Sequence, residues 1–170
     1  RDDFNGQASL DDPATITIFD RSNNSVYRVD YAFNLQNNSG TILPLDADPC
    51  ISNRPTNVRI EKGIYKKTIT LPANTAGYKI VYQRCCRNNA VANIFDDQGS
   101  TYEINIPNTT LCNSSPIFNN QPPLFLCANS KLDFDMSATD ANGDQLVYSL
   151  VAPLQGLDAG DLIICRTTKK

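Results

Sequence analysis

Apolar and polar residues alternate along most of this chain of 170 residues. In the run Val26–Leu35, the apolar residues Tyr27, Val29, Tyr31, Phe33 and Leu35 take every second position. A period of two is that of a half-buried β-strand. The same alternation, or a short β-branched run, predicts further strands at Thr15–Phe19, Tyr65–Leu71, Tyr78–Tyr82, Tyr102–Ile106, Leu132–Met136 and Leu146–Leu150. No long stretch shows a helical period, and Asn88–Phe95 has room for one helical turn.

Turn-forming residues separate these runs. Ser22–Ser25, Asn37–Gly40, Pro72–Asn74 and Asp96–Gly99 are rich in Asn, Ser, Gly and Pro. Many short strands between such turns are typical of an antiparallel β-sandwich. The predicted fold class is therefore all-β, with an antiparallel immunoglobulin-like sandwich.

The alternation also predicts a core. Residues on the apolar phase of several runs are expected to face one another, and burial of each is worth roughly 1.5–3 kcal/mol. They are Tyr27, Val29, Tyr31, Phe33, Ile69, Leu71, Ile80, Tyr82, Ile104 and Ile106.

The stretch Asn119–Pro123 predicts a domain boundary. Its two prolines favour an extended path, and domain linkers are commonly polar and Pro-rich. We expect a first module over residues 1–118, a linker over 119–123, and the start of a second β-module over 124–170. The alternative is that the strands after the linker complete the first module.

Composition narrows the function. The chain has six cysteines and no histidine. A polar, strand-patterned chain with this cysteine content favours disulfides and an extracellular location. Without histidine the chain cannot form a Ser-His or Cys-His pair, so we expect no enzyme and no catalytic residues. The net charge of −3 and the lack of a basic run argue against nucleic acid as a partner, and no apolar run is long enough for membrane insertion.

The six cysteines are predicted to form three bridges, with zinc and free buried thiols as weaker alternatives. Adjacent residues on a strand point to opposite faces, so Cys85 and Cys86 should have different partners. We expect Cys50 to pair with one of them and Cys112 with the other. Cys127 then pairs with Cys165, although six cysteines allow many pairings.

The strongest site signal is the loop Asp140–Asp144. Asp140, Asn142 and Asp144 alternate there, and Gly143 permits a tight bend. Calcium prefers such oxygen ligands, and Asn120 could add a carbonyl oxygen. The predicted cofactor is calcium, with no organic cofactor. The alternative is an Asx-rich turn that holds no ion.

Several motifs together resemble one family. They are Tyr82–Asn89 with its double cysteine, Cys112–Asn120 followed by Pro122-Pro123, Cys127, and Ala138–Leu150. In this order they resemble a module of large gliding-motility-associated Bacteroidota surface proteins. Those proteins leave the cell by type IX secretion and carry PKD-like or cadherin-like repeats. The Asp140–Asp144 loop is similar to the start of a cadherin-like repeat.

This resemblance implies a secreted, non-catalytic structural or adhesive module, an adhesin-like piece of a cell-surface protein. It also implies that a strand precedes Arg1. The expected partners are neighbouring modules of the same polypeptide, together with surface glycans or other surface proteins. The alternative function is a carbohydrate-binding module of a secreted polysaccharide-processing protein.

Overall fold

The computed structural model describes residues 2–3, 10–37, 41–42, 59–84, 99–123, 126 and 129–156. Its strands are β1 (Asp2–Asp3), β2 (Ala14–Asp20), β3 (Val26–Phe33), β4 (Thr41–Ile42), β5 (Arg59–Lys62), β6 (Tyr78–Arg84), β7 (Ser100–Ile106), β8 (Ile117–Phe118) and β9 (Ala138–Thr139). Every strand pair with a described register is antiparallel, and these residues contain no helix. The all-β prediction is therefore confirmed. No helix suited to crossing a membrane is found in this part of the chain.

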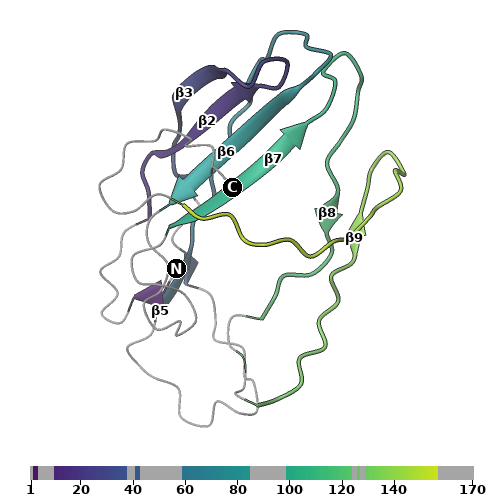
Figure 1. Cartoon of the computed structure of the whole chain (residues 1–170). Helices are drawn as coiled ribbons and strands as arrows, with labels where there is room; N and C mark the ends of the chain where they lie inside the picture. The colour runs from purple at the N-terminus through teal and green to yellow at the C-terminus, as the bar shows by residue number, and fades with distance from the viewer. Residues whose placement is uncertain are drawn as a thin grey trace. The chain divides into compact units, whose positions relative to one another are not determined.

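Four strands form the main sheet, in the order β3-β2-β6-β7 (Figure 1). Its register places Ile18 of β2 opposite Ile80 of β6, and Ile80 opposite Ile104 of β7. Residues directly opposite in neighbouring strands share a face of the sheet. The predicted strands at Thr15–Phe19, Val26–Leu35, Tyr78–Tyr82 and Tyr102–Ile106 correspond to these four.

The buried core belongs to the two inner strands. Ala14, Ile18 and Phe19 of β2 are buried, as are Tyr78 and Val81 of β6. They lie on both faces of the sheet, because adjacent residues such as Ile18 and Phe19 point in opposite directions. The ammonium of Lys79 lies 5.2 Å from the centre of the Phe19 ring.

The predicted core is partly wrong. Tyr27, Val29 and Ile104 are exposed. They stand on the edge strands β3 and β7, where side chains gain cover from a neighbouring strand on one side only. Tyr27 still makes an edge-to-face contact with the buried Tyr78, at 5.4 Å between ring centroids, so its side of the strand was predicted correctly. The side chain of Tyr31 lies outside the described residues. The other members of the predicted core are half-buried, namely Phe33, Ile69, Leu71, Ile80, Tyr82 and Ile106.

The chain divides into two units, each built from three separate stretches. The first unit contains residues 1–14, 34–67 and 112–148, and the second contains 15–33, 68–111 and 149–170. This division does not coincide with the expected boundary at 119–123. Strand β8 lies before that boundary and β9 after it, and the two pair through Ile117–Thr139 and Phe118–Ala138.

The first unit also contains the small sheet β1-β5-β4. Beside it, Leu35 forms an isolated bridge with Tyr65. The Tyr65 hydroxyl donates a hydrogen bond of 2.6 Å to the Asp11 carbonyl oxygen, and the Leu35 N–H donates one of 3.2 Å to Asp12 Oδ1. These contacts join residues more than twenty positions apart.

Three predicted strands are not formed. Apart from the bridge at Tyr65, the runs Tyr65–Leu71, Leu132–Met136 and Leu146–Leu150 have no strand assignment. Alternation shows only that a segment suits a pleated surface, whereas a strand also needs a neighbour for its backbone groups. The possible helical turn at Asn88–Phe95 lies outside the described residues.

Candidate functional site

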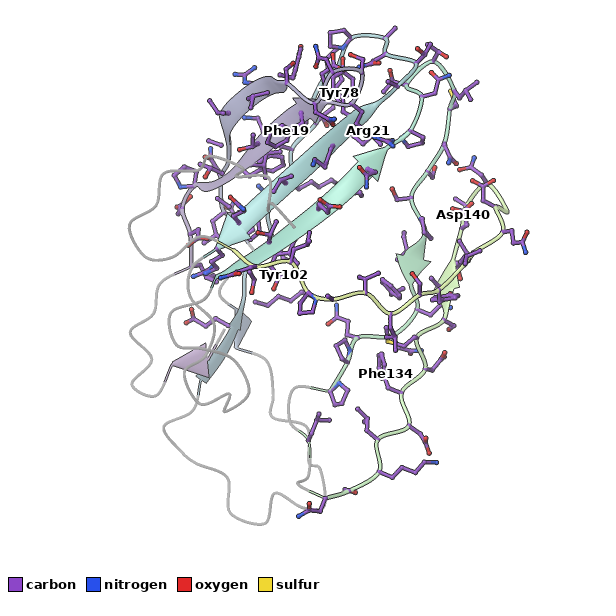
Figure 2. The ribbon with its side chains drawn as sticks, in the orientation of Figure 1. Phe19, Arg21, Tyr78, Tyr102, Phe134 and Asp140 are labelled. Atoms are coloured by element: carbon purple, nitrogen blue, oxygen red, sulfur yellow. The ribbon has the colours of Figure 1, made fainter. Side chains whose placement is uncertain are left out.

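The Asp140 loop follows β9 directly and is a hydrogen-bonded turn (Figure 2). Asp140 Oδ1 accepts the backbone N–H of Asn142 at 2.8 Å and that of Asp144 at 3.1 Å. The Gly143 N–H donates to the Asp140 carbonyl oxygen at 3.3 Å, and Gly143 has φ 78°. Asp commonly stabilises turns in this way, and glycine adopts positive φ at little cost. Asp140 therefore organises the loop through its own carboxylate.

Asn142 connects this loop to a distant segment. Its Oδ1 accepts the backbone N–H of Ser114 at 2.7 Å. The contact extends the link already made by the β8–β9 pair. The amide oxygen that the sequence offered as a calcium ligand thus already accepts a hydrogen bond from the backbone.

Asn120 lies beside Asp135. Its Nδ2 donates to Asp135 Oδ2 at 2.8 Å, and Asp135 Oδ1 accepts the backbone N–H of Ser137 at 2.8 Å. The Ser137 backbone bond, followed by the bond from the Ser137 hydroxyl, lowers the pKa of Asp135 below its ordinary value of 3.8, with Asn120 adding to the effect. The structure thus brings Asp140, Asn142 and Asp144 into one turn and joins Asn120 to Asp135.

Calcium stays a prediction. In the described part of the chain, no three His, Cys, Asp or Glu side chains gather as a metal-binding group. Two carboxylates and one amide would supply only part of the six to eight oxygens that calcium takes. Thermal unfolding with calcium or with a chelator, in the native chain and in Asp144→Ala, tests the prediction. A shift by calcium in the native chain alone would support it.

The sequence did not single out Asp20, whose carboxylate accepts hydrogen bonds in the same way as that of Asp135. Asp20 Oδ1 accepts the Ser22 N–H at 2.8 Å, the Ser22 hydroxyl at 2.6 Å and the Asn74 side-chain amide at 2.8 Å. The Ser22 hydroxyl contributes most to lowering the pKa of Asp20, followed by the Ser22 N–H and Asn74. Both carboxylates share the signal Asp-x-Ser, which starts at the end of β2 for Asp20 and directly precedes β9 for Asp135. The distant asparagine has no local signal.

Asn74 is the centre of a polar cluster at one end of the main sheet. Besides Asp20, its side chain bonds to the Gly77 carbonyl oxygen at 3.1 Å and accepts the Ala76 N–H at 2.9 Å. Its backbone N–H donates to Thr109 Oγ1 at 2.7 Å. The backbones meet closely here, since a Cβ on Gly77 would lie 2.0 Å from the Ile106 carbonyl oxygen. This cluster fixes the turns that flank β2, β6 and β7.

Two tyrosines stack on the outer part of the sheet. Tyr82 of β6 lies opposite Tyr102 of β7, with ring centroids 6.2 Å apart and ring planes 25° from parallel. Tyr102, labelled in Figure 2, has a largely exposed side chain, with 62% of its surface accessible to solvent. An exposed tyrosine held by a stacked neighbour presents a flat apolar face with a hydroxyl at its tip.

Cys112 has a free thiol and is exposed. Its predicted partners Cys85 and Cys86 lie outside the described residues, so that bridge stays a prediction. The other cysteines, Cys50, Cys85, Cys86, Cys127 and Cys165, lie outside the described residues, and their pairing stays a prediction.

Comparisons with known proteins add no relative. No protein family, no curated protein and no solved structure matches this chain.

Proposed function

We propose that this chain is a non-catalytic structural or adhesive module of an extracellular cell-surface protein. Its partners are neighbouring modules of the same polypeptide, and its surface offers contacts to glycans or other surface proteins. The finer fold that goes with this function is an immunoglobulin-like sandwich, next to a cadherin-like stretch around Asp140. Secretion by the type IX route and a part in gliding motility belong to the same proposal, through the ordered motifs from Tyr82 to Leu150.

The observation that carries the proposal is the set of hydrogen bonds that the aspartate carboxylates accept. Asp20, Asp135 and Asp140 each accept the backbone N–H of the residue two positions further along the chain. Hydrogen bonds to the ionised form lower the pKa values of Asp20 and Asp135. A general acid needs a raised pKa to keep its proton near neutral pH. Asp20 and Asp135 therefore act as ionised acceptors that hold nearby backbone and side-chain groups, which suits a structural module.

Surface labelling tests the location. An antibody against the purified chain should label intact cells of the organism that encodes it, and external protease should remove the signal. Labelling that requires lysis of the cells would contradict the proposal. As a test of catalysis, the purified chain should leave a panel of polysaccharides undegraded. Turnover that a single Asp→Asn change abolishes would overturn the non-catalytic part.

The stacked pair Tyr82 and Tyr102 favours a second candidate, a carbohydrate-binding module. Aromatic faces bind the apolar faces of sugar rings, and Tyr102 has its ring supported on one side and open to solvent. This candidate needs no histidine and no carboxylate chemistry, so it is compatible with the same composition.

Binding to immobilised polysaccharides separates the two candidates. For the carbohydrate-binding module, Tyr102→Ala should lower retention at least tenfold. Tyr148→Ala is the matched control, because Tyr148 is similarly exposed but lies near the Asp140 loop. Equal retention of both variants and the native chain would exclude a role for the stacked pair.

A further inference from the structure

Strand β7 forms one edge of the main sheet, and its outward backbone groups can be identified. The Thr101 N–H donates to the Leu154 carbonyl oxygen at 3.3 Å, so the backbone N–H and C=O of Thr101 point away from β6. Backbone groups of successive residues in a strand point to alternate sides. The backbone groups of Glu103 and Asn105 therefore also point outward, while those of Tyr102 and Ile104 point toward β6. In the described part of the chain, nothing bonds to the outward groups of Glu103 and Asn105.

The chain returns to this edge at Leu154–Gly156, which we name the anchor. Ser100 and Gln155 form an antiparallel bridge, and the Gly156 N–H donates to the Gly99 carbonyl oxygen at 3.1 Å. The Thr101 hydroxyl adds a hydrogen bond of 2.8 Å to the Gln155 carbonyl oxygen. The anchor thus holds one end of a segment in strand geometry against the start of β7.

The residues just before the anchor are apolar and uncovered. Leu150 is 104% exposed and Val151 is 80% exposed. Alternation around them predicts a strand, yet no strand forms at these positions. An exposed apolar segment beside an open strand edge leaves both apolar surface and backbone groups without partners.

Extending the register of the anchor along the chain places the apolar residues Leu150 and Val151 beside the open edge of β7. In an antiparallel pair, each residue forward along one strand lies opposite one residue backward along the other. Because Ser100 lies opposite Gln155, this register places Tyr102 opposite Pro153 and Ile104 opposite Val151. Val151 and Ile104, both exposed, would then lie side by side on the same face.

Pro153 fits this register. Since Thr101 bonds to Leu154, the residues whose backbone groups point at β7 are Leu154, Ala152 and Leu150. Pro153 occupies a position whose N–H would point away from β7, so its missing donor costs no hydrogen bond. Proline in a sheet is found mainly at such edge positions.

We propose that residues 150–153 pair with the outer edge of β7 as a fifth strand of the main sheet, in the register of the Ser100–Gln155 bridge. The occupant of the open edge is thus the chain's own segment. The pairing joins the Ala152 and Leu150 backbones to those of Glu103 and Asn105. It also leaves Pro153 on the new edge, where its ring discourages addition of a further strand.

Hydrogen exchange of backbone amides in the intact chain tests this proposal. Closed pairing should slow exchange at Glu103, Asn105, Leu150 and Ala152 by roughly tenfold or more relative to an unstructured peptide. The amides of Tyr102 and Ile104, which face β6, report whether the sheet itself is folded. Protection at Tyr102 and Ile104 with unprotected amides at Glu103 and Asn105 would overturn the proposal.

Two proline variants make the test specific. Ala152→Pro removes a donor that points at β7, whereas Val151→Pro introduces the same ring where the N–H points away. Ala152→Pro should abolish protection at Glu103 and Asn105, and Val151→Pro should keep most of it. Equal loss in both variants, or loss in neither, would refute the register.

Dilution of the protein tests whether a second copy of the chain, rather than residues 150–153, covers the edge of β7. If a second copy covered β7 by edge-to-edge pairing, protection at Glu103 and Asn105 would fall on dilution. Pairing within one chain predicts the same protection at all concentrations. A dependence on concentration would therefore contradict the proposal.

Discussion

The main sheet and the Asp140 region have similar sequence patterns and different burial. Ile18 in β2 is fully buried, while Val147, in an equally apolar run after the Asp140 loop, is 85% exposed. Strand β2 has β3 on one side and β6 on the other, and the run around Val147 has no adjacent strand in the described structure. The comparison shows that alternation identifies which side chains share a face, and that neighbouring strands add to the burial of that face.

Two glycines with the same backbone angle give the largest expected difference. Gly77 and Gly143 both have φ 78°. Any L-residue there costs about 1–2 kcal/mol in stability. A Cβ on Gly77 would also meet the Ile106 carbonyl oxygen at 2.0 Å, whereas Gly143 has nothing within 4 Å. Gly77→Ala should therefore cost about 4 kcal/mol or more, and Gly143→Ala only the backbone cost. Urea unfolding of both variants measures this, and equal losses would contradict it.

Truncating an apolar side chain in each region tests burial. Ile18→Ala should lower the free energy of unfolding by about 2–5 kcal/mol, because Ile18 is 0% exposed. Val147→Ala is the matched control and should change it by less than about 0.5 kcal/mol. A large loss in Val147→Ala would show that the run around Val147 is packed in solution.

Asparagine side chains extend the comparison to polar contacts. Asn74 is part-buried, and its side chain makes three hydrogen bonds, to Asp20, Gly77 and Ala76. Asn74→Ala should cost about 1–3 kcal/mol, since it leaves part-buried partners unsatisfied. Asn119→Ala should cost under about 1 kcal/mol, because its partners Ser137 and Thr139 are at exposed contacts and can bond to water. Denaturant unfolding measures both losses of stability, and equal losses in Asn74→Ala and Asn119→Ala would contradict this expectation.

The smallest expected effects concern pH. The pKa values of Asp20 and Asp135 are lowered in the folded chain, so the stability they contribute is present above the ordinary value of 3.8. It is lost as pH falls through the lowered folded pKa values. The largest cause at Asp20 is the Ser22 hydroxyl, and at Asp135 it is the Ser137 backbone N–H.

Serine variants separate these two causes. Ser22→Ala removes the main donor to Asp20 and should raise its pKa clearly. Ser137→Ala keeps the backbone N–H and should raise the pKa of Asp135 less. NMR titration of the carboxyl groups measures both values, and a larger rise at Asp135 would show that the causes are reversed.

Sequence alone predicted the strands of the main sheet and the turn at Asp140, because both depend on local patterns. Residues 15–19 and 78–82 have the right composition and alternation, and Asp140 is followed by Asn142-Gly143. The exposure of Tyr27 and Ile104 could not be predicted, because edge position depends on strand order. The contact of Asn74 with Asp20 joins residues 54 positions apart, and no local pattern encodes it.

The domain boundary at 119–123 stays a prediction. Strands β8 and β9 pair from either side of Pro122-Pro123. After the Asp140 loop, Gln155 forms a bridge with Ser100 of the main sheet. Local composition shows where a chain is extended and solvated. It does not show which earlier segment a later one will meet.

The interlaced path of the chain has a consequence for folding kinetics. Asp20 of β2 pairs with Tyr78 of β6, and Ser100 pairs with Gln155, so both contacts close long loops. Domains dominated by such distant pairs fold slowly, commonly in milliseconds to seconds. While β6 is still being synthesised, β2 and β3 have only each other as partners. A two-stranded hairpin is marginally stable in water. Strands β2 and β3 therefore depend on the later synthesis of β6, and a chaperone that shields them until then would raise the yield of folded protein.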